Sequence, residues 1–365
     1  MKSIIVIAGG GTGGHIYPGV AIAKSIEMLD SEFEIHFVGS ELGLETKIIP
    51  REGYELHLLP AGKLNYQGGW LNKLKTLLKL PLAFLKSIVW LKKHNPKFVL
   101  GVGGYASGPF VFAATVLGFP TAIWEPNAHP GMTNRILSKW VNKCYLVFEE
   151  ARLTLKSTSI VKVGLPVRPE LESMKINPRE DTEFHVLCFG GSQGARYINR
   201  VFLESVKSEP EWLHKAKLIH QTGIADYAEI NSVYQKSIFS VKPFEFLHEM
   251  NQFYDWADLI ICRSGASTVA ELAAVGKAAV FIPLPTSADN HQLKNAQSVA
   301  LGGGAILLEQ SQLNKDSLNK IIMNLQKHPD ELQKMAKKIK FFHQPKSADV
   351  IAKDILTTIA ENKGK

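Results

Sequence analysis

Two stretches of the chain decide its fold, IIVIAGGGTGGH at residues 4–15 and HVLCFGGSQGAR at residues 185–196. Each begins with an apolar run of strand length, passes directly into a glycine-rich turn and continues as a helix-like segment. A strand, a glycine-rich turn and a helix in this order open a Rossmann-like βαβ unit. Because this opening occurs twice, the sequence predicts two Rossmann-like domains.

Short apolar runs alternate with helix-like segments along the whole chain, which is typical of parallel sheets with crossover helices. Near-continuous apolarity indicates strands that are covered on both faces. The predicted strands of the first half are 3–8, 34–39, 98–103, 121–125 and 143–148, and those of the second half are 185–190, 217–221, 257–264, 278–284 and 305–309.

A proline-containing segment, VGLPVRPE at 163–170, is followed by a polar stretch and predicts the linker. We expect an N-terminal domain at 1–166, a C-terminal domain at 167–345 and a helix within 346–365. Whether that helix packs back onto the first domain stays open. The predicted fold class is α/β, with two parallel sheets facing across a cleft, because open α/β sheets bind ligands at the carboxyl ends of their strands.

The composition limits the classes of function. Forty-two Lys and Arg against 34 Asp and Glu give a net charge of +8, which favours a polyanionic partner such as phosphate, nucleic acid or an anionic membrane. Three scattered cysteines favour a reducing compartment. The first apolar run is too short for a signal peptide, and no apolar stretch is long enough to span a bilayer. We therefore expect a cytoplasmic protein that can contact a membrane peripherally.

The first glycine-rich turn has the G-x-G-x-x-G spacing of a dinucleotide fingerprint, at Gly9, Gly11 and Gly14. Backbone N–H groups and a helix N-terminus at such a turn can hold a pyrophosphate. A nicotinamide-binding domain also needs an acid after its second strand, where Glu41 is a poor match. His15, directly after the last glycine, departs from the dehydrogenase pattern.

Two further glycine-rich turns follow strands, GVGGYASGP at 101–109 and GGSQGAR at 190–196. Glycine lets backbone amides approach an anion closely, so the first two turns can bracket one diphosphate and the third can hold a second phosphorylated ligand. Two phosphate sites favour group transfer over hydride transfer. The alternative that these glycines only form tight turns stays open.

Seven motifs occur in order: GGGTGGHIYPG (9–19), GVGGYASGP (101–109), EPNAHPG (125–131), VGLPVRPE (163–170), GGSQGAR (190–196), CRSGASTVAE (262–271) and DNHQLKNA (289–296). Together they closely resemble the MurG family of UDP-N-acetylglucosamine:lipid I N-acetylglucosaminyltransferases. The resemblance covers residue 3 to about residue 300. It implies a GT-B fold, a donor UDP-sugar in the C-terminal domain and a membrane-facing N-terminal domain that takes the acceptor.

The resemblance also implies the reaction. N-acetylglucosamine would pass from UDP-N-acetylglucosamine to the muramyl 4-hydroxyl of lipid I, an undecaprenyl-pyrophosphoryl-muramyl peptide. The product, lipid II, is used in peptidoglycan synthesis, and the enzyme would act at the cytoplasmic face of the cell membrane.

The resemblance further assigns roles to individual residues. His15 matches the proposed catalytic base, and Glu271 matches a ligand of the ribose hydroxyls. The other implied substrate-binding positions are Thr12, Gly13 and Gly14 in the first turn, Asn127 at the sugar, Arg168 and Ser192 at the donor diphosphate, Leu247 at uracil, Ala266, Ser267, Thr268, Val269 and Ala270 at the ribose and phosphate, and Gln292 at the sugar hydroxyls. The acceptor diphosphate is assigned to Gly103, Gly104, Tyr105 and Ser107.

Elementary chemistry supports these roles. Loss of UDP leaves charge on the β-phosphate, which the helix N-termini after Ser192 and Ser264, with Arg168 and Arg263, can stabilise. A histidine is a base of suitable pKa for the attacking hydroxyl, although His15 as a helix cap or phosphate ligand stays an alternative. Direct displacement inverts the anomeric centre. No Asp-x-Asp, HExxH or paired histidine spacing occurs, so we expect no protein-held metal and no cofactor, while a Mg²⁺ bound through the phosphates stays an alternative.

Residues 63–93 contain seven lysines and no acid. In one continuous helix, Lys75, Lys79, Lys86 and Lys93 would form a stripe, interspersed with tryptophan, leucine and phenylalanine. This pattern indicates a segment that binds an anionic membrane surface. Pro81 is expected to break or kink the helix. A crossover helix with a solvated basic face is an equally open alternative.

Several other functions stay open. An NAD-dependent oxidoreductase would use the first turn but leaves the second glycine-rich domain unexplained. A transferase with another lipid acceptor and a UDP-sugar epimerase share the expected architecture. Nucleic-acid binding ranks last, because no aromatic and basic interleaving supports it.

Overall fold

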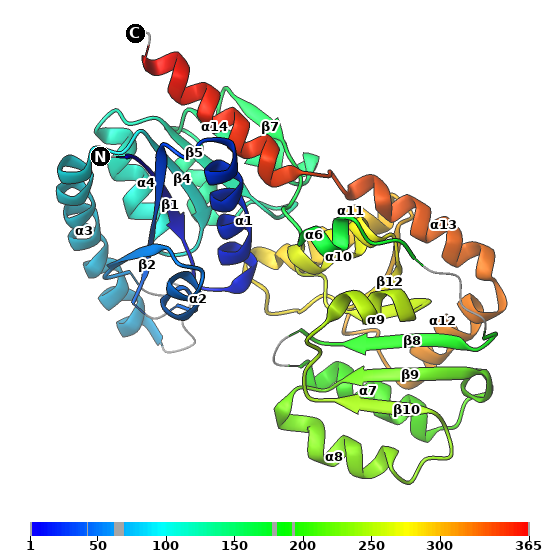
Figure 1. The fold of residues 1–365 in the computed structure, drawn as a ribbon. Helices are drawn as coiled ribbons and strands as arrows, with labels where there is room; N and C mark the ends of the chain where they lie inside the picture. Colours follow the sequence, from blue (N-terminus) through cyan, green and yellow to red (C-terminus); the bar gives the residue numbers. More distant parts are fainter. Residues whose placement is uncertain (1, 42, 62–68, 177–180, 192–193, 364–365) are drawn as a thin grey trace. The chain divides into compact units, whose positions relative to one another are not determined.

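The structure is a computed structural model that describes residues 2–41, 43–61, 69–176, 181–191 and 194–363, with the side chains of 69–78, 288 and 363 excepted (Figure 1). The chain forms two compact units. Unit 1 comprises Met1–Val167 and Gln344–Lys365, and unit 2 comprises Arg168–His343.

Unit 1 contains a seven-stranded parallel sheet with the strand order β3-β2-β1-β4-β5-β6-β7. Its strands are β1 Ser3–Gly9, β2 Phe33–Ser40, β3 Glu55–Leu59, β4 Phe98–Gly103, β5 Thr121–Glu125, β6 Lys143–Leu146 and β7 Ile160–Lys162. Its helices are α1 Gly13–Leu29, α2 Glu45–Arg51, α3 Gly69–His94, α4 Ser107–Val116, α5 Met132–Leu137, the 3₁₀ helix η1 Glu149–Leu153 and α14 Ser347–Lys363. The strand order reverses between β1 and β4, which makes this edge the topological switch point where such sheets bind ligands.

The central strands of unit 1 are buried on both faces, as their apolar sequences require. On one face, α3 and α4 pack over a core that includes Val6, Val99 and Phe110. On the other face, α1 lies against the sheet at Gly19, where an added methyl group would stand 3.3 Å from Ile7 and 3.4 Å from Phe37.

Helix α14 joins unit 1 by packing on α1 (Figure 1). Asp354 on α14 accepts hydrogen bonds from Lys143 Nζ at 2.7 Å and from the Tyr145 hydroxyl at 2.6 Å. Ser25 on α1 donates to Asp349 at the start of α14. The buried face of this helix consists of Ile351, Ala352, Ile355 and Ile359. The C-terminal helix is thus part of the core of unit 1.

Unit 2 contains a six-stranded parallel sheet with the order β10-β9-β8-β11-β12-β13. Its strands are β8 Phe184–Phe189, β9 Ala216–Gln221, β10 Val241–Phe244, β11 Leu259–Cys262, β12 Ala278–Phe281 and β13 Ala305–Leu307. Its helices are α6 Pro169–Glu172, α7 Arg196–Lys207, η2 Glu211–Lys215, α8 Ile224–Tyr234, α9 Met250–Trp256, α10 Ala266–Val275, η3 Ala288–Asn290, α11 His291–Leu301, α12 Lys315–Lys327, α13 Pro329–Ile339 and η4 Lys340–Phe342. The switch point of this sheet lies between β8 and β11.

The ten strands predicted from the sequence are all present, with ends displaced by a few residues. Three strands were not predicted, β3, β7 and β10, and each lies at the edge of a sheet. Helix α3 continues through Pro81, so the expected break is absent from its backbone. Among the described residues, no helix is long and apolar enough to cross a bilayer.

Candidate active site

The switch point of unit 1 brings the first two glycine-rich turns together. Gly10 N donates a 3.1 Å hydrogen bond to Gly103 O. A methyl group on Gly104 would stand 2.4 Å from Gly10 O, so no larger residue fits there without a backbone shift. Gly103 and Gly104 have φ values of +96° and +88°, which favour glycine. The pairing of β1 with β4 therefore joins residues that lie more than 90 positions apart in the sequence, such as Ala8 and Gly101.

His15 lies over the second turn. It belongs to the first turn of α1, and its imidazole packs against Gly103, where an added methyl group would stand 2.8 Å from both Cε1 and Nδ1. Thr12, which precedes α1, is exposed, and Gly13 and Gly14 are partly exposed. Sequence positions predicted to bind substrate thus border one edge of the unit 1 sheet.

Tyr105 and Ser107 complete this edge. The Tyr105 ring lies 3.9 Å from the position of a methyl group on Gly11, and burial raises the pKa of its hydroxyl. Ser107 is buried, and its hydroxyl has no hydrogen-bond partner in the described part of the chain. The hydroxyl of Ser107 is thus fully buried and lies close to Gly101 of β4, where an added methyl group would stand 2.7 Å from it.

Glu45 is a buried carboxylate that the sequence did not single out. Its Oε2 accepts a 2.6 Å hydrogen bond from Gly11 N, and its Oε1 accepts bonds from Ser40 N at 2.9 Å and the Ser40 hydroxyl at 2.8 Å. A methyl group on Gly10 would stand 2.3 Å from the carboxyl carbon. Glu45 thus fixes the backbone of the first turn through Gly11 N. Gly10 is required because a side chain at this position would collide with the Glu45 carboxylate.

Asn127 is held by a second buried carboxylate, Glu125 at the end of β5. The Asn127 backbone N–H and side-chain amide donate to Glu125 Oε1 at 2.9 and 3.1 Å. Asn134 Nδ2 and Gly131 N donate to Oε2 at 2.9 and 3.1 Å. Burial raises the pKa of Glu125, and these four donors oppose the rise. The loop that presents Asn127 is therefore fixed by one carboxylate.

The switch point of unit 2 has a similar construction. β8 leads through Gly190 to α7, and β11 leads through Ser264 and Gly265 to α10. Gly265 is the N-cap of α10, so no side chain covers the first N–H groups of that helix. An added methyl group on Gly191 or Gly265 would have no atom of the described residues within 4 Å. Ser192, predicted to bind the donor diphosphate, lies outside the described residues.

Glu271, on α10, is the centre of a hydrogen-bonded group. Arg168 Nη2 lies 3.3 Å from Glu271 Oε1, and the Tyr254 hydroxyl donates to Oε2 at 2.8 Å. Burial raises the pKa of Glu271, while Arg168 and Tyr254 oppose the rise. Arg168 and Glu271, which were predicted separately, thus form an ion pair. Tyr254, which the sequence did not indicate, is a second partner of Glu271.

The other predicted residues of α10 differ in exposure. Ala266, Ser267 and Thr268 in the first turn are partly exposed, whereas Val269 and Ala270 are buried. The exposed N-terminal turn can meet a ligand through its N–H groups, and the buried pair packs the helix onto the unit.

The guanidinium of Arg263 donates hydrogen bonds to acceptor atoms of the protein itself. It donates to Ile282 O at 3.0 Å, Pro283 O at 2.9 Å and Gln310 Oε1 at 2.8 Å. Burial lowers its pKa. These contacts fix the segment that follows β12, which carries the next predicted residue.

Gln292, at the start of α11, accepts a 3.0 Å hydrogen bond from Leu284 N through Oε1. Its backbone carbonyl accepts from the Ser264 hydroxyl at 2.8 Å, which ties α11 to the turn before α10. Leu247 is buried between β10 and α9, next to the exposed Phe246. Apart from Arg168, which precedes α6, the predicted donor-binding residues thus lie on segments that follow β8, β10, β11 and β12.

Comparison with known proteins gives consistent matches over both units. Residues 5–146 match the glycosyltransferase family 28 N-terminal domain, and residues 185–353 match the family 28 C-terminal domain. A UDP-N-acetylglucosamine–N-acetylmuramyl-(pentapeptide) pyrophosphoryl-undecaprenol N-acetylglucosamine transferase of Bdellovibrio bacteriovorus is 48% identical over 98% of this chain and 99% of its own length. The protein of the same name in Myxococcus xanthus is 40% identical over 95% of this chain and 91% of its own.

A solved structure agrees with this relationship. The crystal structure of MurG from Acinetobacter baumannii is similar with a TM-score of 0.81 and 28% identity, over 98% of this chain and 100% of that chain. The GT-B fold expected from the sequence is therefore confirmed.

Proposed function

The chain belongs to the MurG family of glycosyltransferases, and from this premise we propose that it transfers N-acetylglucosamine from UDP-N-acetylglucosamine to lipid I, forming lipid II. The observation that carries the proposal is the 48% identity to a transferase of that specificity over 98% of the chain. It favours sugar transfer over the oxidoreductase that the first glycine-rich turn alone would allow.

Unit 2 binds the donor in this proposal. Glu271 accepts the two ribose hydroxyls, because Tyr254 and Arg168 occupy one position on each carboxylate oxygen and leave further lone pairs free. The uncapped first turn of α10 and the turns at Gly191 and Gly265 receive the diphosphate. Leu247 and the exposed Phe246 next to it lie on the loop assigned to uracil.

Unit 1 binds the acceptor. Gly103, Gly104, Tyr105 and Ser107 of the second turn are assigned to the acceptor diphosphate, because Gly10 N and Gly11 N of the first turn already donate to Gly103 O and Glu45. Asn127, fixed by Glu125, is assigned to the sugar. His15, packed on Gly103, is assigned the role of general base for the acceptor hydroxyl.

The reaction is a single displacement. The muramyl 4-hydroxyl loses its proton to His15 as its oxygen attacks the anomeric carbon of the donor. The bond from that carbon to the β-phosphate oxygen breaks, and its electron pair stays with UDP. The α10 N-terminus and Arg168 stabilise the negative charge that develops there. Attack opposite to the leaving group inverts the anomeric centre, and no step requires a metal held by side chains.

Helix α3 provides the membrane contact in this proposal. Leu82, Leu85 and Val89 on its outer face are 49%, 58% and 68% exposed, although they are large and apolar. Ala83, Ser87 and Leu91 on the opposite face are buried. A shallow groove of about 370 Å³ separates some of the outer side chains and is lined by Leu85, Lys86, Val89, Trp90, Lys93 and His94.

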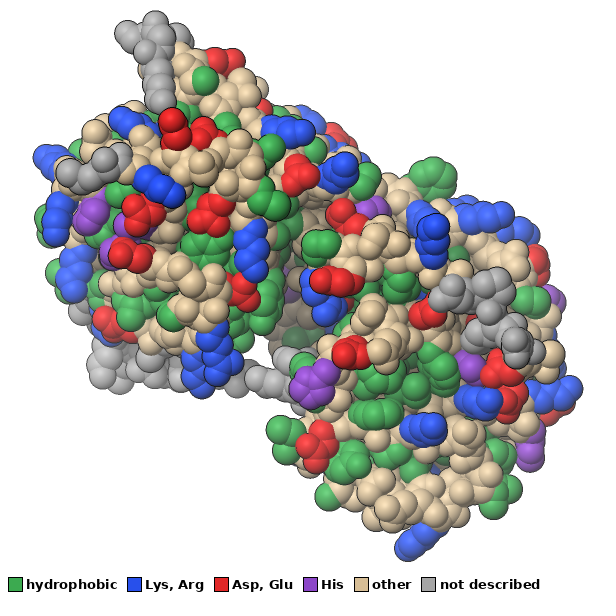
Figure 2. Space-filling view, viewed as in Figure 1, with side chains coloured by type: hydrophobic (Ala, Val, Ile, Leu, Met, Phe, Trp, Pro, Cys, Tyr) green, Lys and Arg blue, Asp and Glu red, His purple; other side chains and the backbone are tan. Residues whose placement is uncertain are grey.

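Lysines flank these apolar side chains. Figure 2 shows basic and hydrophobic side chains next to one another along the left edge of unit 1, where α3 lies. Apolar side chains can enter the headgroup region while lysines contact anionic lipid, which suits an enzyme whose acceptor has a lipid anchor. We therefore assign the enzyme to the cytoplasmic face of the membrane, bound peripherally.

A transfer assay tests the proposed reaction. The chain should convert radiolabelled UDP-N-acetylglucosamine and lipid I into lipid II and should show little transfer from UDP-galactose. Glu271→Ala should raise the KM for UDP-N-acetylglucosamine, whereas Glu204→Ala, which removes an exposed acid from α7, should not. Absence of transfer by the unaltered chain, in the presence of lipid I and vesicles, would disprove the proposed activity.

A further inference from the structure

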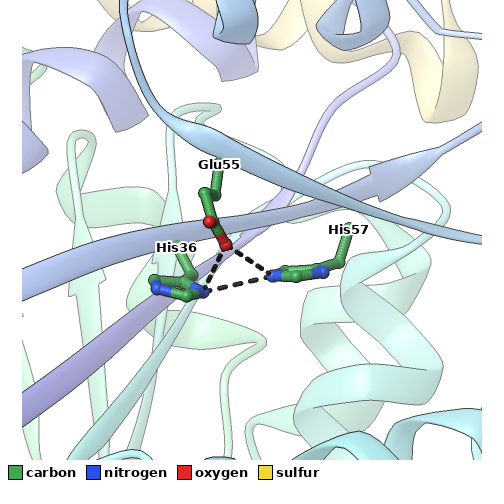
Figure 3. Close-up of side chains that lie close together, drawn as sticks. All are labelled: His36, Glu55 and His57. Atoms are coloured by element: carbon green, nitrogen blue, oxygen red, sulfur yellow. Dashed lines mark hydrogen bonds and ion pairs between the residues drawn. The ribbon is translucent and has the colours of Figure 1, made fainter.

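Two neighbouring strands of unit 1 carry the same short pattern, Glu34-Ile35-His36 on β2 and Glu55-Leu56-His57 on β3. The strands pair in parallel, with His36 opposite Glu55 and Val38 opposite His57. Because side chains alternate along a strand, His36, Glu55 and His57 emerge on the same face. Figure 3 shows the three side chains pointing toward one another.

The three nearest side-chain atoms form an almost regular triangle. His36 Nδ1 lies 3.1 Å from His57 Nε2. Glu55 Oε2 lies 3.5 Å from His36 Nδ1 and 3.6 Å from His57 Nε2. Ligand atoms at about 2.1 Å from a tetrahedral Zn²⁺ are separated by about 3.4 Å, so this triangle has the dimensions of one face of such a site.

The protein alone does not provide good hydrogen bonds for all three of these atoms. The two ring nitrogens can share one proton in a hydrogen bond, but the Glu55 oxygen then lies too far from both rings for a strong bond. A cation among the three atoms would interact with all of them. Glu34 Oε1 lies 3.2 Å from the other ring nitrogen of His36, which is an ion-pair distance without hydrogen-bond geometry, so this nitrogen has no hydrogen-bond partner among the described residues.

The exposure of the cluster fits a site that opens to solvent. The side chain of His36 is 6% exposed, that of His57 is 30% exposed and that of Glu55 is 63% exposed. On α3, Trp90 stacks on His94 at 4.1 Å and its ring centroid lies 4.9 Å from that of His57. These rings support the buried side of the cluster, and water can supply a fourth ligand from the exposed side.

We propose that His36, Glu55 and His57 bind one divalent transition-metal cation of the Zn²⁺ class. Two imidazoles and one carboxylate are ligands that Zn²⁺, Co²⁺ and Ni²⁺ accept, and Mg²⁺ and Ca²⁺ prefer oxygen ligands. The cation ties the edge strand β3 to β2 and is separate from the transfer chemistry. It bridges side chains that lie up to 21 positions apart, which accounts for its absence from the motifs visible in the sequence.

Metal titration of the full chain without a histidine tag tests this site. After treatment with a chelator and dialysis, the protein should bind one Co²⁺ per chain with the visible absorption of tetrahedral cobalt, and Zn²⁺ should displace it. Zn²⁺ should also slow amide hydrogen exchange in residues 55–59. His57→Gln should lower the affinity more than tenfold and abolish the effect on exchange, as removal of a ligand requires.

Two further variants keep the test decisive. Glu55→Gln alters the most exposed of the three side chains, so it should fold normally and still weaken Co²⁺ binding. His328→Gln removes an exposed histidine of unit 2 and should bind Co²⁺ like the unaltered chain. Absence of stoichiometric binding, or binding that persists in His57→Gln and Glu55→Gln, would overturn the proposal in favour of a simple His36–His57 hydrogen bond.

Discussion

The hydroxyl of Tyr254 donates a 2.8 Å hydrogen bond to Oε2 of Glu271, from a position where the tyrosine ring is buried. Burial and the neighbouring carboxylate raise the pKa of Tyr254 well above its ordinary value, so the hydroxyl remains a donor at neutral pH. Arg168 approaches the other carboxylate oxygen. Glu271 therefore has a fixed orientation before any ligand binds, and Tyr254 is a positioning residue for the proposed ribose contact.

Removal of this hydroxyl should weaken donor binding. We expect Tyr254→Phe to raise the KM for UDP-N-acetylglucosamine roughly 3- to 10-fold with little change in kcat, because one hydrogen bond is lost and the ring still packs. Tyr234→Phe is a matched control, since its buried hydroxyl pairs with His220 at 2.9 Å in the same unit. Equal KM values for the two variants would contradict the assigned role.

Removal of the proposed base should affect turnover and leave donor binding unchanged. We expect His15→Ala to lower kcat by roughly 10²- to 10⁴-fold, because the acceptor hydroxyl then lacks a base in the transition state. UDP binding measured by calorimetry should stay within about twofold of the unaltered chain, since the proposed donor residues belong to unit 2. Near-normal turnover would remove His15 from the chemistry and favour its alternative role at the acceptor diphosphate.

The contact between His15 and Gly103 predicts an indirect effect on catalysis. An alanine at 103 would place a methyl group 2.8 Å from the His15 ring and move that ring. A displacement of about 1 Å can lower a rate roughly 100-fold, so we expect a kcat loss of that order in Gly103→Ala. Gly53→Ala has a similar φ, +86° against +96°, and open space around the added methyl group. This control should lose some stability and retain its kcat.

The outer face of α3 predicts how the protein binds vesicles. We expect the double variant Leu85→Ser, Val89→Ser to bind anionic vesicles roughly tenfold or more weakly, because two exposed apolar side chains no longer enter the headgroup region. Leu153→Ser, which alters a more exposed leucine on η1, should bind normally. Sedimentation with vesicles at low and at high salt separates the contribution of the apolar side chains from that of the attraction between lysines and anionic lipid. Binding that depends on neither the apolar residues nor anionic lipid would favour a solvated basic helix.

Buried strands were predictable from the sequence, whereas three of the four edge strands, β3, β7 and β10, were not. β4 and β5 lie inside the sheet and coincide with the predicted ranges 98–103 and 121–125. β3 and β10 are edge strands, exposed on one side, and they include Glu55 and Pro243, which a central strand would not tolerate. Their sequences therefore lack the continuous apolarity that identified the other strands.

The candidate site was predictable where it depends on local turns. The glycine-rich turns predicted which backbone groups lie at each switch point, because a parallel βαβ fold places every such turn at one sheet edge. Long-range partners of those turns were not predictable. Glu45 contacts Gly11 across 34 positions, and Tyr254 contacts Glu271 from another helix. The cluster of His36, Glu55 and His57 is indicated in the sequence only by the repeated Glu-x-His pattern. It was not predicted, because β3, which carries two of the three residues, was not predicted as a strand.

The return of α14 to unit 1 has a consequence for the order of folding during synthesis. Unit 2 is encoded by one uninterrupted segment, while the two pieces of unit 1 flank it. Helix α1 is translated before unit 2, whereas α14, which packs on it through a buried face of Ile351, Ile355 and Ile359, is translated after unit 2. Unit 2 can therefore complete its fold during synthesis before unit 1, although the synthesis of unit 1 begins first.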